Sequence, residues 1–164
     1  MSEISAQELE DFTRRYHELI ASQQTLLLST ASAFGVPEIS YAPFVRGHAG
    51  LFYIFVSEMA GHTTNLLNNP QASILFIRPE SECRNLFARE RVVLSCSVKE
   101  ILREDEIFID RLQALQDKFG EVVNVLRSLS DFHLFALRPE SGRFVIGFGR
   151  AFTVNVNDSS LRHI

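Results

Sequence analysis

The chain of 164 residues has little of what would assign it to a specialised class of protein. Its two cysteines, Cys83 and Cys96, lack CxxC spacing and nearby histidines, so we expect reduced thiols rather than a zinc site or a disulfide framework. The formal net charge is −4 and the basic residues form no long cluster. Binding of nucleic acid through a basic face is therefore not expected.

Long hydrophobic runs are also missing. No apolar stretch approaches the roughly 20 residues that span a bilayer, and the segment Met1–Ser5 lacks the basic and apolar parts of a secretory signal. We therefore expect a cytoplasmic protein with no membrane partner. The chain also contains no GxSxG elbow, no P-loop, and no GxGxxG sequence after a strand, so it offers no signal for the chemistry of those motifs.

The composition is that of an ordinary soluble domain, with 46% hydrophobic and 22% charged residues, and we expect one domain over residues 1–164. Apolar residues at helical spacing predict an opening helix of about four turns. They are Leu9, Phe12, Tyr16, Leu19 and Ile20. A second amphipathic helix begins near residue 104, and Gly120 is expected to break it. Its apolar stripe favours a core or dimer contact over a cofactor pocket.

Short apolar and β-branched segments separated by turn residues indicate a barrel with flanking helices, in the α+β class. We expect strands at about 25–31, 38–46, 51–56, 72–78, 91–102, 132–138 and 143–149. The sequence Pro139-Glu140-Ser141-Gly142 predicts a hairpin-like turn between the last two. Residues 153–164 are expected to form a C-terminal tail.

The stretch from Ser57 to Pro79 is the most informative in the chain. After a predicted strand come three hydroxyls and an imidazole, at Ser57, His62, Thr63 and Thr64, and then a short helix that stops before Pro70. The free N–H groups at the start of such a helix can hold a phosphate or a carboxylate. The simplest interpretation is that Ser57 and Thr63 cap the helix.

Together with Ser29-Thr30 and the segment Gly35–Phe44, this stretch resembles the pyridoxamine 5'-phosphate oxidase-like split-barrel superfamily, and the resemblance covers nearly the whole chain. It implies a split β-barrel of about 6–7 antiparallel strands. It also implies a homodimer with the cofactor site between subunits. His62 stands where many flavin-binding members carry Lys. This residue, and Asp131-Phe132 followed by the segment Gly142–Ala151, resemble the haem-utilisation (HugZ/HutZ-type) branch.

Resemblance to that branch implies three roles. His163 would be the axial ligand of the haem iron, although the tail is shorter than in haem-binding relatives and a frayed terminal residue is the plain alternative. Asp131 would accept a hydrogen bond from the other ring nitrogen of that ligand, unless it is a turn residue. Arg91 would lie on the distal side, with Arg89 as a competitor and a solvated strand-end cation as the alternative.

The remaining polar residues fit two cofactors. With haem, His62 would line the pocket beside Ser57, Thr63 and Thr64. With FMN, it would replace a phosphate-binding Lys with only partial charge, and Arg78 and Arg91 would supply stronger cations. Two other histidines are expected to be structural. They are His48 in a turn and His133 as a hydrogen-bonded strand residue.

The resemblance therefore implies a haem-binding protein that degrades haem oxidatively, opening the macrocycle at a meso carbon and releasing iron. An external electron donor is expected because the sequence shows no second redox site. The alternative enzyme is an FMN-binding oxidoreductase related to pyridoxamine 5'-phosphate oxidase. A second alternative is a haem carrier or storage protein without catalysis.

Overall fold

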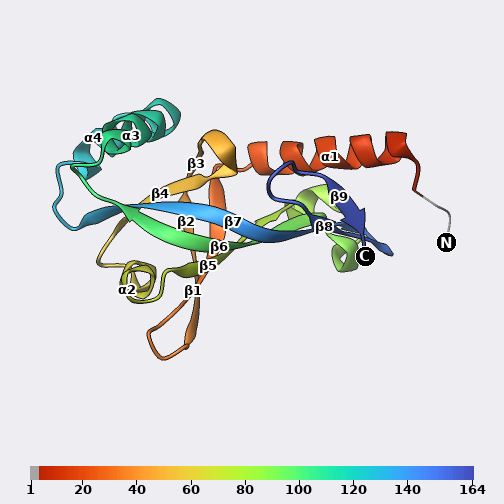
Figure 1. Cartoon of the computed structure of the whole chain (residues 1–164), viewed down its shortest axis with the longest axis horizontal. Helices are drawn as coiled ribbons and strands as arrows, with labels where there is room; N and C mark the ends of the chain where they lie inside the picture. The colour runs from red at the N-terminus through yellow and green to blue at the C-terminus, as the bar shows by residue number, and fades with distance from the viewer. Residues whose placement is uncertain (1–3) are drawn as a thin grey trace.

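The computed structural model describes residues 4–164, which form a twisted antiparallel sheet of nine strands flanked by helices (Figure 1). The strand order is β2-β1-β5-β6-β7-β4-β3, and β8 pairs with both β7 and β9. The strands are β1 (Thr25–Ala31), β2 (Pro37–Pro43), β3 (Val45–Arg46), β4 (Phe52–Ser57), β5 (Gln71–Ile77), β6 (Arg91–Ile101), β7 (Phe132–Gly147), β8 (Arg150–Val154) and β9 (Leu161–His163). Because β2 also contacts β4, the sheet curls into the predicted split barrel.

Within the described residues, four α-helices flank the sheet. They are α1 (Ala6–Ala21), α2 (Gly61–Asn68), α3 (Glu106–Phe119) and α4 (Val122–Leu126). Three short 3-10 turns, η1 (His48–Gly50), η2 (Glu80–Glu82) and η3 (Leu86–Ala88), complete the elements. α1 begins with a capping box between Ser5 and Glu8 and buries the predicted apolar stripe. Gly120, with φ of 86°, separates α3 from α4 as predicted. Within residues 4–164, no helix has both the length and the apolar character needed to cross a bilayer.

Two hydrophobic cores lie on opposite faces of the sheet. The larger fills the barrel beneath α1 and includes alternate residues of β6, at Val92, Leu94, Cys96 and Val98. The smaller lies beneath α3 and includes Leu112. The amphipathic stripe of α3 is therefore core, as expected. Alternation along β6 leaves the opposite set of side chains on the outer face of the barrel.

The predicted turn at residues 139–142 is wrong, because β7 runs through it as one strand from Phe132 to Gly147. The register of β6 and β7 shifts here, since Ser95 pairs with Ser141 but Cys96 pairs with Pro139. Glu140 is thus the extra residue of a β-bulge. A bulge can accommodate proline, which cannot donate to a regular ladder, so the turn-like composition of this segment marks an irregular strand.

The true reversal follows β7, where Gly147 pairs with Arg150 and Gly149 has φ of 66°. The expected tail is therefore largely structured, because β8 ends at Val154 and β9 returns antiparallel to it. Phe44 also interrupts the predicted strand 38–46, which becomes β2 and β3. These differences matter for the site, since they fix the position of the C-terminal histidine.

Candidate functional site

The candidate residues fall into two groups at opposite ends of β7 (Figure 1). Asp131 immediately precedes the strand, whereas Arg91 pairs with Val145 near its far end. His163 pairs with Phe152 at the same far end, on β9. β7 is one continuous strand, and at a rise of about 3.3 Å per residue the 14 positions from 131 to 145 span roughly 45 Å when straight. One chain alone therefore does not bring Asp131 beside His163 and Arg91.

The first group is built around the turn between β4 and α2. The Ser57 hydroxyl donates to Asp131 Oδ2 at 2.6 Å and accepts from the Met59 N–H at 3.1 Å. The Glu58 N–H donates to the Asp131 carbonyl at 2.9 Å. Asp131 is half-buried and is fixed through both its side chain and its backbone. No residue among 4–164 donates to Asp131 Oδ1, which leaves that oxygen as an acceptor.

The prediction that Ser57 and Thr63 cap α2 is wrong. The N-cap is Ala60, and no side chain caps the helix. Thr63 is fully buried, and its hydroxyl donates to the Ser57 carbonyl at 2.6 Å. Thr64 is exposed and its carbonyl accepts from the Asn68 side chain. Three residues separate Ser57 from the first residue of α2. The hydroxyls of Ser57 and Thr63 therefore bond within the turn before the helix, and neither caps a free N–H group of α2.

His62 is buried, with its Nδ1 2.8 Å from the Ser40 hydroxyl. Burial lowers the pKa of His62 and outweighs the opposing effect of Glu38, so the imidazole is neutral at neutral pH. The carboxylate of Glu38 lies against the start of α2, because a Cβ added at Gly61 would meet Glu38 Oε1 at 2.6 Å. Glu38 also accepts from Asn65 at 3.1 Å. A neutral imidazole and a nearby carboxylate make this helix start a poor phosphate site.

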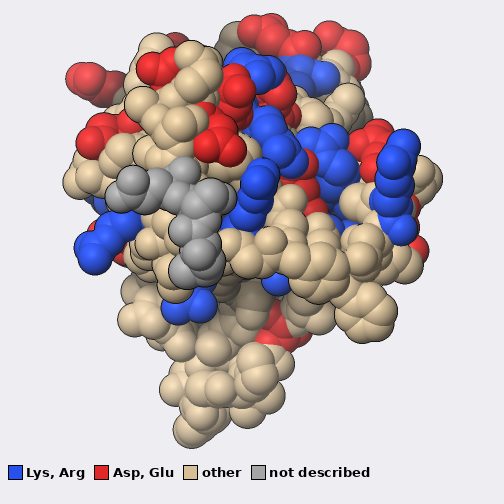
Figure 2. Space-filling model, turned by 90° about the vertical axis from the view of Figure 1, so that its right-hand side faces the viewer, with Lys and Arg blue, Asp and Glu red and all other residues tan. Residues whose placement is uncertain are grey.

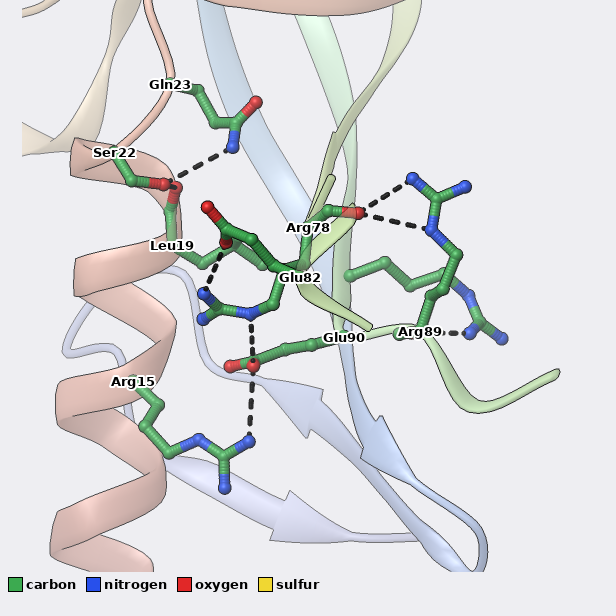
Figure 3. A network of polar contacts seen from close by, with 9 residues as sticks. Arg15, Leu19, Ser22, Gln23, Arg78, Glu82, Arg89 and Glu90 are labelled. Carbon is green, nitrogen blue, oxygen red and sulfur yellow. Dashed lines mark hydrogen bonds and ion pairs between the residues drawn. The ribbon is translucent and has the colours of Figure 1, made fainter. Parts of the chain in front are cut away.

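The second group centres on Glu90, a carboxylate that the sequence analysis did not single out (Figure 3). Glu90 Oε2 accepts from Arg78 Nε at 2.9 Å and from Arg15 Nη2 at 3.2 Å. Its Oε1 is buried without a partner among residues 4–164. Arg78 is therefore already committed to a buried carboxylate, which weakens its predicted role toward a flavin phosphate. The only sequence signal was the alternation of charge in Arg89-Glu90-Arg91.

Arg89 and Arg91 differ in how far they are engaged. The guanidinium of Arg89 donates twice to the Arg78 carbonyl, at 3.1 and 2.7 Å. Arg91 donates once, from Nη1 to the Arg89 carbonyl at 2.9 Å, and pairs with no carboxylate of residues 4–164. Figure 2 views this end of the molecule and shows basic side chains gathered there with acidic ones among them. Arg91 therefore makes fewer contacts than Arg89 and is the better candidate to bind an anionic ligand.

His163 is half-buried and has a defined ring orientation. Its Nε2 lies 2.9 Å from the Gly149 carbonyl, and its ring meets Phe152 edge-on with centroids 5.4 Å apart. A carbonyl only accepts, so Nε2 is the nitrogen that carries a hydrogen, and Nδ1 has the lone pair in that neutral tautomer. Gly149 therefore makes, within the chain, the contact that resemblance assigned to Asp131. A metal-ligating histidine commonly has its other N–H held in this way.

His48 and His133 fulfil the structural expectations. His48 begins the η1 turn, and His133 lies between two carboxylates, 2.6 Å from Glu100 and 2.7 Å from Glu58. Burial lowers the pKa of His133, but both carboxylates raise it, and the net shift is upward. Among residues 4–164, no cluster of three or more His, Cys, Asp and Glu side chains could hold a metal ion. Haem would need only an axial ligand from the chain.

The curled antiparallel sheet, with α1 and α3 on its faces and a polar turn between β4 and α2, defines a split-barrel protein. Residues 12–146 match the sequence profile of the family described as Pyridoxamine 5'-phosphate oxidase. The chain belongs to this family. The matched region contains Asp131, Arg91 and His62, but it ends before His163.

One relative is named for haem, and two solved structures align over most of the chain. The chain is 40% identical, over 86% of its length and 80% of the relative, to the Vibrio cholerae protein named haem oxygenase HutZ. A crystal structure of HutZ, described as a haem storage protein of that organism, aligns with 37% identity and a TM-score of 0.73, covering 77% of this chain and 89% of HutZ. ChuZ of Campylobacter jejuni aligns with 30% identity and a TM-score of 0.83, covering 94% of this chain and 63% of ChuZ.

Proposed function

We propose that the protein binds haem in a site shared by two copies of the chain and opens it oxidatively, releasing iron. The observation that carries the proposal is the 40% identity, over most of the chain, to a protein named haem oxygenase. When bound, haem would be both the substrate and the centre at which oxygen is activated. HutZ is described both as a haem oxygenase and as a haem storage protein. Measuring whether this protein degrades bound haem therefore distinguishes an enzyme from a storage protein.

The chain's own groups fit such a ligand. His163 offers an imidazole whose Nε2–H is held by the Gly149 carbonyl, which leaves Nδ1 as the nitrogen that would bind iron. In this proposal Arg91 would hold an anionic oxygen of the bound ligand by charge-assisted hydrogen bonds. Asp131, held by Ser57, orients a proton donor through its second oxygen. Near Asp131, Ser57 and Thr64 would line the pocket, while His62 and the fully buried Thr63 would support this side of it from behind.

A second copy is required because the two groups lie at opposite ends of β7. The outer face of the barrel offers a surface for it. Four apolar residues stand side by side there in strand register, Tyr41 beside Leu27, then Leu75, then Val93. Tyr41 is 63% exposed and Leu27 is 37% exposed. A homodimer would cover this row and build two equivalent sites, each with residues from both chains.

The electrons for turnover would come from an external donor. The two thiols, Cys83 and Cys96, are free, and burial raises the pKa of Cys96 to about 12, so that thiol is inert as a reductant. Free thiols also suit a reducing compartment, and we assign the protein to the cytoplasm on that ground.

Haemin titration tests the proposal. The wild-type protein should develop a saturable Soret band, His163→Ala should lose or shift it, and His48→Ala, a change in an exposed turn, should not. With ascorbate and oxygen in the presence of catalase, the band should decay with iron release in an enzyme and persist in a carrier. A tight FMN complex without a Soret band would replace the proposal with the flavin alternative.

Mixing two inactive variants tests the shared site. If Asp131 of one chain works with His163 of the other, an equal mixture of Asp131→Asn and His163→Ala chains contains hybrid dimers with one intact site each. Random exchange makes half of the dimers hybrids, so activity should return to about one quarter of the wild-type level. No recovery, with exchange confirmed by mass spectrometry, would mean that the two residues do not act across subunits.

A further inference from the structure

A polar pocket of about 340 Å³ lies where α1, the η1 turn and the loop leading into β9 meet. It contains none of the haem candidates described above. Figure 1 shows that loop beside α1. Tyr16 and His17 reach the pocket from α1, Arg46 from β3, and Asn157 and Ser159 from the loop. Three segments far apart in sequence thus converge on one basic side chain.

Arg46 brings a positive charge that no carboxylate of residues 4–164 neutralises. Its Nη1 lies 3.4 Å from His17 Nδ1, and its guanidinium lies 5.4 Å from the ring centroid of Phe52. A guanidinium only donates, so His17 Nδ1 must accept and the imidazole is neutral. Burial, and then Arg46 itself, lower the pKa of His17 in agreement with this geometry. Arg46 differs in this from Arg78, which Glu90 neutralises.

Tyr16 supplies a buried hydroxyl beside this charge. The residue is 3% exposed, and its ring packs edge-on against Phe144 with centroids 5.8 Å apart. Burial raises the pKa of the Tyr16 phenol, so at neutral pH it is a neutral hydrogen-bond donor. A guanidinium and a phenol at one pocket are donors suited to an oxyanion.

The backbone of the pocket is unusual as well. Ala49 and Ser159 are the non-glycine residues with positive φ among residues 4–164, at 58° and 61°, and both line this pocket. Such conformations cost on the order of 1 kcal/mol and concentrate at ligand sites. The nearest acidic side chain of the loop, Asp158, accepts from the Ser160 N–H at 2.9 Å and so caps its own turn.

We propose that this pocket binds a small oxyanion through a phosphate or carboxylate group, with Arg46 as its charged ligand and Tyr16 as a second donor, and that the bound anion fixes the loop 155–160. The loop continues directly into β9. An occupant of the pocket therefore also holds the hairpin that carries His163. Nothing in this inference requires haem, so it stands or falls separately from the proposed function.

Equilibrium dialysis of the full chain, without haem, tests the site with inorganic phosphate and, in separate samples, with succinate. At least one anion should bind saturably, and Arg46→Gln should weaken it about tenfold or more, the loss expected for a charge-assisted contact. Arg46→Lys should keep part of the affinity. The matched control is Arg162→Gln, which removes the same charge from an exposed position on β9 and should bind as the wild type does.

Hydrogen exchange tests the link to the loop. The bound anion should slow exchange at residues 155–160 in the wild type and in Arg162→Gln, and not in Arg46→Gln. Circular dichroism checks that each variant is folded, and Tyr16→Phe replaces Arg46→Gln if that variant is not. The proposal is overturned if neither anion binds saturably up to about 20 mM. It is also overturned if Arg46→Gln or its replacement binds as tightly as the wild type, or if binding leaves exchange in the loop unchanged.

Discussion

Replacing Glu90 with Gln tests how firmly the second group of polar residues is held. Glu90 keeps 7% of its side chain exposed, while its partners Arg15 and Arg78 keep 37% and 32%. The substitution preserves shape but removes the negative charge from two hydrogen bonds. It also places an amide where Oε1 is buried without a partner among residues 4–164.

The expected loss of stability depends on how deeply Glu90 and its two arginine partners are buried. Breaking a fully buried ion pair costs about 3–5 kcal/mol, whereas an exposed pair contributes about 0–1 kcal/mol. Glu90 is at the buried limit, but water reaches both arginines and would solvate the guanidinium groups released. We therefore expect a loss of about 2 kcal/mol in the free energy of unfolding, or about 4–8 °C in Tm for a domain of this size.

Urea unfolding followed by circular dichroism, at one protein concentration and without ligand, measures this change. The matched control is Glu82→Gln, because Glu82 pairs with the same Arg78 at 3.4 Å but is 57% exposed. That variant should lose less than about 0.5 kcal/mol. The reasoning is refuted if Glu90→Gln is as stable as the wild type, or if the control loses as much stability as Glu90→Gln.

Two further predictions concern β7. A Cβ at Gly142 would lie 2.6 Å from the Leu94 side chain, whereas a Cβ at Gly147 would meet nothing within 4 Å. In urea unfolding, Gly142→Ala should therefore lose about 1–3 kcal/mol of stability, and Gly147→Ala should lose almost none. Equal losses would contradict the packing. Folding raises the pKa of His133 above its unfolded value of about 6.5. The contribution of protonated His133 to stability is therefore complete below about pH 6.5, and it is lost as the pH rises through the pKa of His133 in the folded protein. An NMR titration should show that pKa fall in Glu100→Gln, and an unchanged pKa would count against the pair.

The sequence predicted those elements whose signal is local. The apolar stripe of α1 and the glycine that ends α3 each depend on neighbours within a few residues, and both predictions were confirmed. The strands of the barrel were confirmed where apolar runs were bounded by turn residues. At Pro139 the local signal failed, because the pairing of β7 with β6 holds the segment extended and absorbs Glu140 as a bulge. Tertiary pairing overrode turn preference there.

The candidate site depends on distances that no single sequence displays. The contact between Ser57 and Asp131 joins residues 74 positions apart, and the contact between His133 and Glu58 spans 75. Both arise from the pairing of β4 with β7. Glu90 was missed for the same reason, since its partner Arg15 belongs to α1. Resemblance named Asp131 and His163 together, but it could not show that Asp131 precedes β7 while His163 lies on β9, beside the far end of β7.

That separation limits which dimer the proposed function can use. If the two chains pack through the outer face of the barrel with a twofold axis crossing the strands near the middle of β7, each Asp131 end meets the partner's Arg91 end. An axis parallel to the strands would instead bring like ends together and leave both groups incomplete. The middle of β7 is the bulge at Glu140, flanked by Ser141, whose cross-strand neighbour is Ser95. A crossing axis would therefore pass beside Ser95 and Ser141, which are both small and exposed. Recovery of activity on mixing the two variants requires that axis.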